Sequence, residues 1–144
     1  MNKQKINSWI LASRPRTLPA ALVPVMVGSA LAIYHGIFFP AYSIVALLCS
    51  ILIQIGTNFT NDLYDYLKGT DTAERKGPLR VLASGLITVN EMKRGIFLVF
   101  FTAFLLGLYL VYSVGLMILW IGIFSIIAGL AYTAGPFPLA YNGL

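Results

Sequence analysis

The sequence predicts an all-α membrane protein, a polytopic bundle of about four transmembrane helices. Hydrophobic residues make up 58% of the 144 residues, charged residues make up only 10%, and the mean hydropathy is +0.82. A soluble domain carries about 25% charged residues. The charges are also unevenly spread, because residues 36–61 are uncharged and no charged residue follows Arg94. Such stretches can cross a membrane, whose hydrocarbon core of about 30 Å needs roughly 20 apolar residues per span.

The expected spans follow one another with mostly short connections. We place them at about 17–34, 41–67, 95–112 and 116–134, and the second is apolar to residue 61 and polar beyond it. The connections after the first and third spans, "YHGIFFPA" and "YSVG", contain glycine or proline and are typical of tight helical hairpins. The connection at about 68–94 is longer and charged. The pattern therefore predicts two helical hairpins joined by one polar loop.

Lysine and arginine occur on one side of the expected membrane only. They precede the first span or lie in the connection at about 68–94: Lys3, Lys5, Arg14, Arg16, Lys68, Arg75, Lys76, Arg80, Lys93 and Arg94. Because basic loops remain in the cytoplasm, we expect a multi-pass protein of the cell membrane with both termini and this loop cytoplasmic. The net charge of +5 then reflects topology and contact with anionic membrane lipid, and no nucleic-acid partner is expected.

The end of the second span is unusually polar. The segment "QIGTNFTNDLYDYLKGTD", residues 54–71, holds three of the five acidic residues. On a helix, Asn58, Asn61, Asp62 and Asp65 share one face, and Gln54 lies one turn deeper. Two carboxylates on one face near a membrane repel each other, and a hard divalent cation such as Mg²⁺ would relieve that repulsion. An ordinary helix end entering water explains the same spacing equally well.

The loop that follows favours the metal interpretation. It places four basic side chains beside the acidic face: Lys68, Arg75, Lys76 and Arg80. Lysine and arginine are suited to phosphate oxygens, so acidic and basic groups together at a membrane surface indicate a metal–diphosphate site. The alternative is a solvated cytoplasmic loop, which explains the sign of the loop charges but not the paired carboxylates.

Three blocks carry a resemblance to a known family. "RPRTLPAALVPVMVGSALA", "QIGTNFTNDLYDYLKGTDTAERKGPLR" and "YTAGPFPLAYNGL" resemble the UbiA superfamily of intramembrane prenyltransferases, in particular its 1,4-dihydroxy-2-naphthoate polyprenyltransferase branch, the MenA type. The resemblance implies a helical fold of nine spans around a central cavity. It also implies that Mg²⁺, held by two Asp-rich motifs, grips a polyprenyl diphosphate while the aromatic acceptor, 1,4-dihydroxy-2-naphthoate, is alkylated.

The resemblance assigns roles to individual residues. Asp62 and Asp65 match the first Asp-rich motif and are the expected catalytic residues. Gly69 stands where that motif has its last Asp and is expected to end the helix, and Asp71 comes two residues later. The implied Mg²⁺ ligands are Asn61, Asp62, Asp65 and Asp71. The implied substrate-binding residues are Asn58, Lys68, Arg75, Arg80, Arg14 and Arg16, although the last two are explained equally well as topology anchors.

One departure from the family pattern affects the expected activity. No acidic residue follows Glu91, so the second Asp-rich motif is missing from this sequence. We therefore expect the chain to be the N-terminal half of a prenyltransferase domain and to be inactive by itself. Two alternatives stay open: a prenyltransferase for another aromatic acceptor, and a small non-catalytic membrane partner or transport subunit, which would not depend on Mg²⁺.

The charge distribution gives a testable topology. Reporter fusions at Gly36 and Gly115 should be active outside the cell, and fusions at Gly77 and Leu144 should be active in the cytoplasm. Alkaline phosphatase and green fluorescent protein, which are active on opposite sides of the membrane, measure this directly. An external signal at Gly77 would contradict the topology, because it would place the basic loop on the wrong side.

Overall fold

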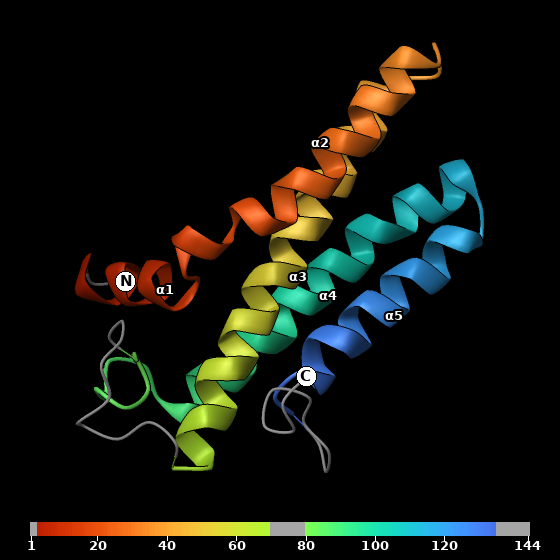
Figure 1. Cartoon of the computed structure of the whole chain (residues 1–144). Helices are drawn as coiled ribbons and strands as arrows, with labels where there is room; N and C mark the ends of the chain where they lie inside the picture. Colours follow the sequence, from red (N-terminus) through yellow and green to blue (C-terminus); the bar gives the residue numbers. More distant parts are fainter. Residues whose placement is uncertain (1–2, 70–79, 135–144) are drawn as a thin grey trace.

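The described part of the protein is entirely helical. The computed structural model describes residues 3–69 and 80–134 (Figure 1). The elements are α1 (Lys3–Ala12), the short 3-10 helix η1 (Pro15–Thr17), α2 (Pro19–Tyr34), α3 (Pro40–Leu67), α4 (Val89–Val114) and α5 (Met117–Ala131). No β-strand occurs in these ranges. The predicted class, an all-α membrane bundle, is confirmed.

Local sequence explains where the long helices begin and end. Pro40 occupies the first turn of α3, where its fixed φ suits a helix and its missing N–H costs nothing. α3 ends at Leu67, and Gly69 follows with a left-handed φ of 68°, as expected for a glycine beyond a helix end. α4 begins with a capping box in which the Thr88 side chain and Glu91 each accept a hydrogen bond from the other's backbone N–H.

Two helices are long and apolar enough to cross a membrane by length and composition. These are α3, with 28 residues, and α4, with 26. The segments Lys3–Thr17 and Pro19–Tyr34 qualify as a third span if the pair, bent by 54°, is counted as one. α5 is apolar but has only 15 residues, since it begins at Met117 after the Gly115 break and ends at Ala131. The described residues thus contain two or three candidate spans by this criterion, compared with the four we expected.

α3 is the central helix of the bundle. It packs against α1, α2, α4 and α5, and α4 and α5 also pack on each other (Figure 1). Two hydrogen bonds join it to α2. The Ser29 hydroxyl of α2 donates to the Ser43 hydroxyl of α3 at 3.0 Å, and the Ser50 hydroxyl of α3 donates to the carbonyl of Ala21 in α2 at 2.9 Å. On the other side the Phe100 ring of α4 lies directly against Gly56, which leaves no room for a side chain there.

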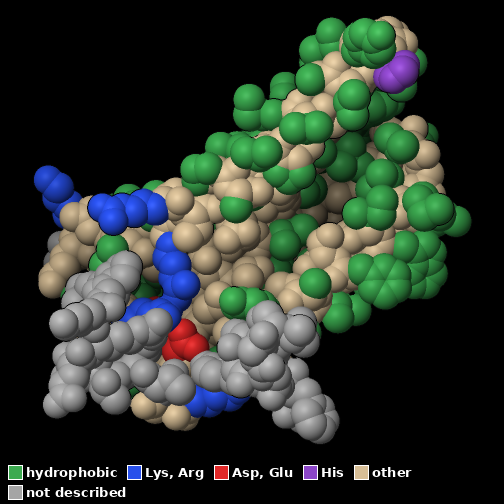
Figure 2. Space-filling view, in the orientation of Figure 1, with side chains coloured by type: hydrophobic (Ala, Val, Ile, Leu, Met, Phe, Trp, Pro, Cys, Tyr) green, Lys and Arg blue, Asp and Glu red, His purple; other side chains and the backbone are tan. Residues whose placement is uncertain are grey.

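The surface has the character of a membrane protein. Large hydrophobic side chains are exposed along α2, α4 and α5, including Met26, Phe97 and Phe124. Figure 2 shows hydrophobic side chains over the upper and right-hand parts of the visible face, while the lysines and arginines gather at the opposite end. Apolar patches of this extent are not left in water by soluble proteins. The separation of the basic end from the apolar remainder agrees with the charge pattern of the sequence.

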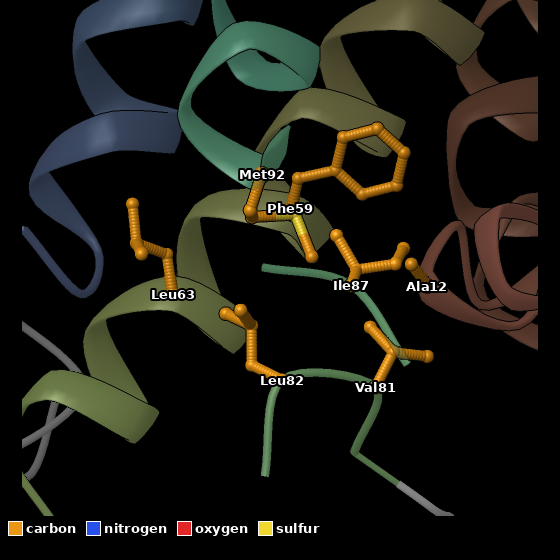
Figure 3. Packing of buried hydrophobic residues seen from close by; sticks show 7 residues of the cluster. All are labelled: Ala12, Phe59, Leu63, Val81, Leu82, Ile87 and Met92. Carbon is orange, nitrogen blue, oxygen red and sulfur yellow. The ribbon is translucent and has the colours of Figure 1, made fainter. Parts of the chain in front are cut away.

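The buried hydrophobic core lies at this basic end rather than in the middle of the bundle. It consists of Ala12, Phe59, Leu63, Val81, Leu82, Ile87 and Met92 (Figure 3). These residues come from α1, α3, the start of α4 and the segment that leads into α4. Residues 80–88 are therefore anchored by their apolar side chains, although the sequence led us to treat them as part of a charged loop.

α1 was not predicted from the sequence, and it packs across the basic end. The Trp9 ring lies 5.2 Å from the Phe59 ring between centroids and rests against Gly95 of α4. Lys5 donates hydrogen bonds to Glu91 at 2.7 Å and to the carbonyl of Leu86 at 3.1 Å. These contacts hold α1 against both α3 and the first turn of α4.

The contact between Trp9 and Gly95 predicts a position-specific effect on stability. A Cβ at Gly95 would lie 2.6 Å from the Trp9 ring, so Gly95→Ala must displace that ring from its place between α1 and α4. We expect it to lower the free energy of unfolding by about 1–3 kcal/mol. Unfolding of the purified protein in mixed micelles, titrated with a denaturing detergent, measures the change.

Gly107 of α4 is the matched control, because no described atom lies within 4 Å of the place that a Cβ would occupy there. Gly107→Ala should be neutral or stabilising by up to about 1 kcal/mol, as for an unobstructed helix position. Equal effects of the two substitutions would contradict the docking of α1 on α4.

Candidate functional site

The polar face of α3 is buried at the basic end of the molecule. The exposed fractions are 3% for Asn58, 9% for Asn61, 3% for Asp62 and 9% for Asp65. The shared face predicted from helical spacing is therefore present, and it points into the protein rather than into solvent. Burying two carboxylates on adjacent turns is costly unless each finds a cation or hydrogen-bond donors.

Arg80 supplies a cation to both carboxylates. Its Nη2 lies 2.6 Å from Oδ2 of Asp65, and its Nη1 lies 3.5 Å from Oδ1 of Asp62. All three groups are largely withdrawn from solvent: for the side chain alone, rather than the whole residue as above, the exposed fractions are 14%, 13% and 4% for Arg80, Asp65 and Asp62. Arg80 is held there because Val81, the next residue, is part of the buried core.

The end of α5 completes another side of the site. Thr133 is 3% exposed and donates a hydrogen bond to Oδ1 of Asn61 at 2.6 Å. Lys68 donates to the backbone carbonyl of Thr133 at 3.4 Å, which places the Lys68 ammonium beside the same turn. The sequence analysis assigned no role to Thr133, and only its place in the block "YTAGPFPLAYNGL" could have marked it.

The bend between α1 and α2, which we call the elbow and which comprises residues 13–18, forms a further side of the site. Asn58 donates to the carbonyl of Ser13 at 2.8 Å and to the hydroxyl of Thr17 at 2.9 Å, so its amide nitrogen ties α3 to the elbow. Arg14, at the elbow, has a left-handed backbone with φ 49° and ψ 69°, which is uncommon for a residue with a side chain. Its Nη2 atom is buried and has no hydrogen-bond partner among the described residues. Arg16 is exposed.

An apolar cavity begins one helical turn deeper in the membrane. Its volume is about 500 Å³, and residues of α2, α3, α4 and α5 line it. Gln54, on the polar face of α3, is one of its few polar lining residues, together with Ser50 and Ser125. A cavity of this size falls within the range of small-molecule sites, about 300–1,000 Å³. The polar face therefore leads from the buried carboxylates into an apolar space.

The polar side chains of α3 could bind a divalent cation only together with a ligand that supplies further oxygen atoms. In residues 3–69 and 80–134, no group of three or more acidic, histidine or cysteine side chains could hold a metal ion by itself. Mg²⁺ usually takes one or two protein carboxylates and fills its other positions with water and phosphate oxygens. Asp62 and Asp65, with the amide of Asn61 beside them, match that donor set if the ligand carries phosphate.

The structure thus brings most of the predicted site residues to one place. Asn58, Asn61, Asp62, Asp65 and Arg80 are joined through α3 and its partners, with Lys68 at the same end of α3. Arg14 contributes its buried guanidinium at the elbow, whereas Arg16 points outward. Asp71 and Arg75, which we also expected in the site, lie outside the described residues.

A comparison with family models identifies one match. Residues 21–144 match the model described as the UbiA prenyltransferase family, which covers α2 to α5 and the buried polar face. No solved structure matches the chain significantly.

Curated proteins that resemble the chain bear a common name. Relatives named 1,4-dihydroxy-2-naphthoate octaprenyltransferase are 41% identical in Escherichia coli, 38% in Haemophilus influenzae and 37% in Bacillus subtilis. The alignments cover 100%, 100% and 93% of this chain but 50%, 49% and 43% of those proteins. The chain therefore spans about half the length of the curated relatives it matches.

The bridging position of Arg80 gives a prediction on stability. Arg80→Gln leaves two buried carboxylates facing each other without the guanidinium, so we expect a loss of about 3–5 kcal/mol in the free energy of unfolding. The matched control is Arg94→Gln, since Arg94 is exposed on the first turns of α4 and should change stability by no more than about 0.5 kcal/mol. Detergent-titrated unfolding of both variants tests this, and similar losses would show that Arg80 does not neutralise the pair.

Proposed function

The chain belongs to the UbiA prenyltransferase family, and from this membership we propose that the protein transfers a polyprenyl group from polyprenyl diphosphate to 1,4-dihydroxy-2-naphthoate. The names of the bacterial relatives support this acceptor. The observation that carries the proposal is the buried pair Asp62 and Asp65, placed beside Arg80 on the same face of α3 as Gln54, which lines an apolar cavity.

The buried pair would bind the diphosphate through Mg²⁺. Asp62, Asp65 and Asn61 are the residues we assign to the ion, and Asp71 is a further proposed ligand. When bound, Mg²⁺ would draw negative charge away from the departing diphosphate. Buried carboxylates hold such an ion more firmly than exposed ones, because the low local dielectric strengthens the attraction.

Basic side chains around the pair would contact the diphosphate oxygens directly. Arg80 is already fixed next to the carboxylates, and Lys68 lies at the same end of α3. Arg14 has a buried guanidinium nitrogen without a partner among the described residues, which makes it suited to an anionic group. We propose the same role for Asn58 and Arg75, whereas the exposed Arg16 fits the alternative role of a topology anchor.

The cavity would hold the apolar part of the substrates. An isoprenoid chain is a hydrocarbon, so its burial between α2, α3, α4 and α5 is favourable, while the charged head stays at the polar face. Asn58 and Gln54, on successive turns of α3, lie between the carboxylates and the cavity. Positioning the reactive carbon at this boundary would bring it close to the departing group and to the acceptor ring.

The orientation of the protein sets the side on which the reaction occurs. The basic end contains the carboxylates, and the distribution of lysine and arginine supports a cytoplasmic location for that end. We therefore propose that diphosphate and acceptor are taken from the cytoplasmic side of the cell membrane, and that the product is released into the lipid.

The central test is the substitution Asp65→Asn in the whole protein, purified and assayed with Mg²⁺, a polyprenyl diphosphate and 1,4-dihydroxy-2-naphthoate. Loss of one metal-binding carboxylate should reduce prenyl transfer at least about a hundredfold. Asp71→Asn should cost less, since Asp71 comes after the end of α3 at Leu67 and so does not belong to the helical face that carries the pair. A larger effect at Asp71 than at Asp65 would contradict the site as we have assigned it.

Glu91→Gln is the matched control, because it also removes one carboxylate from the same end of the protein. Glu91 belongs to the capping box of α4 and contacts Lys5, not the buried pair. Its substitution should leave transfer within a few-fold of wild type. Activity that does not depend on Mg²⁺ would argue against the proposed mechanism, and activity with a different aromatic acceptor alone would change the proposed substrate.

A further inference from the structure

α1 has an apolar flank that no described part of the protein covers. At about 100° per residue, Trp9, Ile6 and Ile10 follow one another around the helix, and Lys3 and Asn7 continue the circle as a polar flank. Ser8 and Ala12 form the third face and are buried. Trp9 packs against Phe59, but Ile6 and Ile10 are 42% and 54% exposed. Trp9 thus packs inside the protein, whereas Ile6 and Ile10, which form the apolar flank, face outward.

The orientation of this flank is fixed by contacts on the buried side. Lys5 holds Glu91 at 2.7 Å, and the Trp9 ring fills the space over Gly95. α1 cannot rotate about its axis to hide Ile6 and Ile10 without breaking both contacts. The exposure of this flank is therefore built into the packing of α1.

The surroundings of the flank show what it meets. The elbow at Arg14 bends α1 away from α2 by 54°, so α1 leaves the direction of the bundle at the basic end. Beyond the elbow the exposed side chains of α2, among them Val23, Met26 and Val27, form part of the surface that faces lipid. α1 itself lies at the edge of the bundle, at its basic end (Figure 1).

The charges around α1 favour an anionic partner. Lys3, Arg16, Lys93 and Arg94 are exposed. The acidic side chains of the described residues are engaged elsewhere, because Asp62 and Asp65 are buried with Arg80 and Glu91 is held by Lys5. A second copy of the chain would bring like charges together, whereas the headgroups of an anionic leaflet would neutralise them.

We propose that α1 is an interfacial helix, whose Ile6 and Ile10 side chains insert below the headgroups of the anionic cytoplasmic leaflet while Lys3 and Arg16 contact lipid phosphates. A helix with one apolar flank and flanking basic residues binds at this depth by combining hydrophobic burial with electrostatic attraction. α1 contacts the first turns of α4 through Lys5 and Trp9, and it contacts α3, which bears the carboxylates, through Trp9. This inference does not depend on the proposed enzymatic activity.

The experiment uses the full chain in lipid nanodiscs and a spin label on single cysteines. In a Cys49→Ala background, a label is attached to Ile6→Cys, Ile10→Cys or Asn7→Cys, and helical content and thermal unfolding verify each variant. Accessibility of the label to oxygen, which concentrates in lipid, is compared with accessibility to a water-soluble nickel chelate. Asn7 is the matched control, because it adjoins Ile6 in sequence and belongs to the polar flank.

The labels at Ile6 and Ile10 should have a ratio of oxygen to nickel accessibility several-fold higher than the label at Asn7. A ratio equal to that of Asn7 would show that the flank lies in water and would overturn the proposal. Magnetic broadening between labels at Ile10 on two copies would assign the flank to a dimer contact and would overturn it as well.

A second arm tests the anionic component. Nanodiscs of phosphatidylcholine alone are compared with nanodiscs that also contain phosphatidylglycerol, and the Ile10 label should lie deeper in the anionic discs. The double variant Lys3→Gln and Arg16→Gln should abolish this difference without lowering thermal stability, since both side chains are exposed. Equal depths in the two lipids for the unaltered chain would overturn the assignment of an anionic partner.

Discussion

The burial of two carboxylates on one membrane helix is the constraint around which the basic end is organised. Asp62 and Asp65 lie one turn apart, almost without exposure, and each must be compensated. The compensating guanidinium comes from Arg80, outside the helix, so the segment before α4 has to fold back onto α3. Val81, Leu82 and Ile87 are part of the buried hydrophobic core, and their packing holds Arg80 next to the carboxylates.

This constraint explains why the most tightly packed part of the protein is at the rim of the membrane. In a bundle whose outer surface is solvated by lipid, apolar burial between helices contributes little, because lipid tails are as apolar as the side chains. At the rim, by contrast, water is present and the hydrophobic effect acts fully. Phe59 and Met92 are therefore buried together at the basic end of the bundle, with the partly buried Trp9 packed against them.

The sequence predicted those features that depend on periodicity and charge. The helical class, the two hairpins and the shared face of Asn58, Asn61, Asp62 and Asp65 follow from hydrophobic runs and a period of 3.6 residues, which are local properties. The end of α3 near Gly69 was also expected, and the structure places it after Leu67. α1 was missed because its ten residues are short and of mixed polarity, so the packing of Trp9 against Gly95, a contact with distant sequence, decides its conformation. The role of Thr133 depends on a hydrogen bond between residues 72 positions apart, which no local pattern reveals.

Arg80 and Thr133, the partners of the polar face of α3, lie at different distances along the chain, and this has a consequence for biosynthesis. Arg80 follows Asp65 by 15 residues, whereas Thr133 follows Asn61 by 72. During translation, the guanidinium that neutralises the carboxylates becomes available before α4 has been made. The acidic turn and the cation that neutralises it are therefore synthesised together, ahead of the second hairpin, which later adds the core residue Met92 and the hydroxyl donor of Thr133.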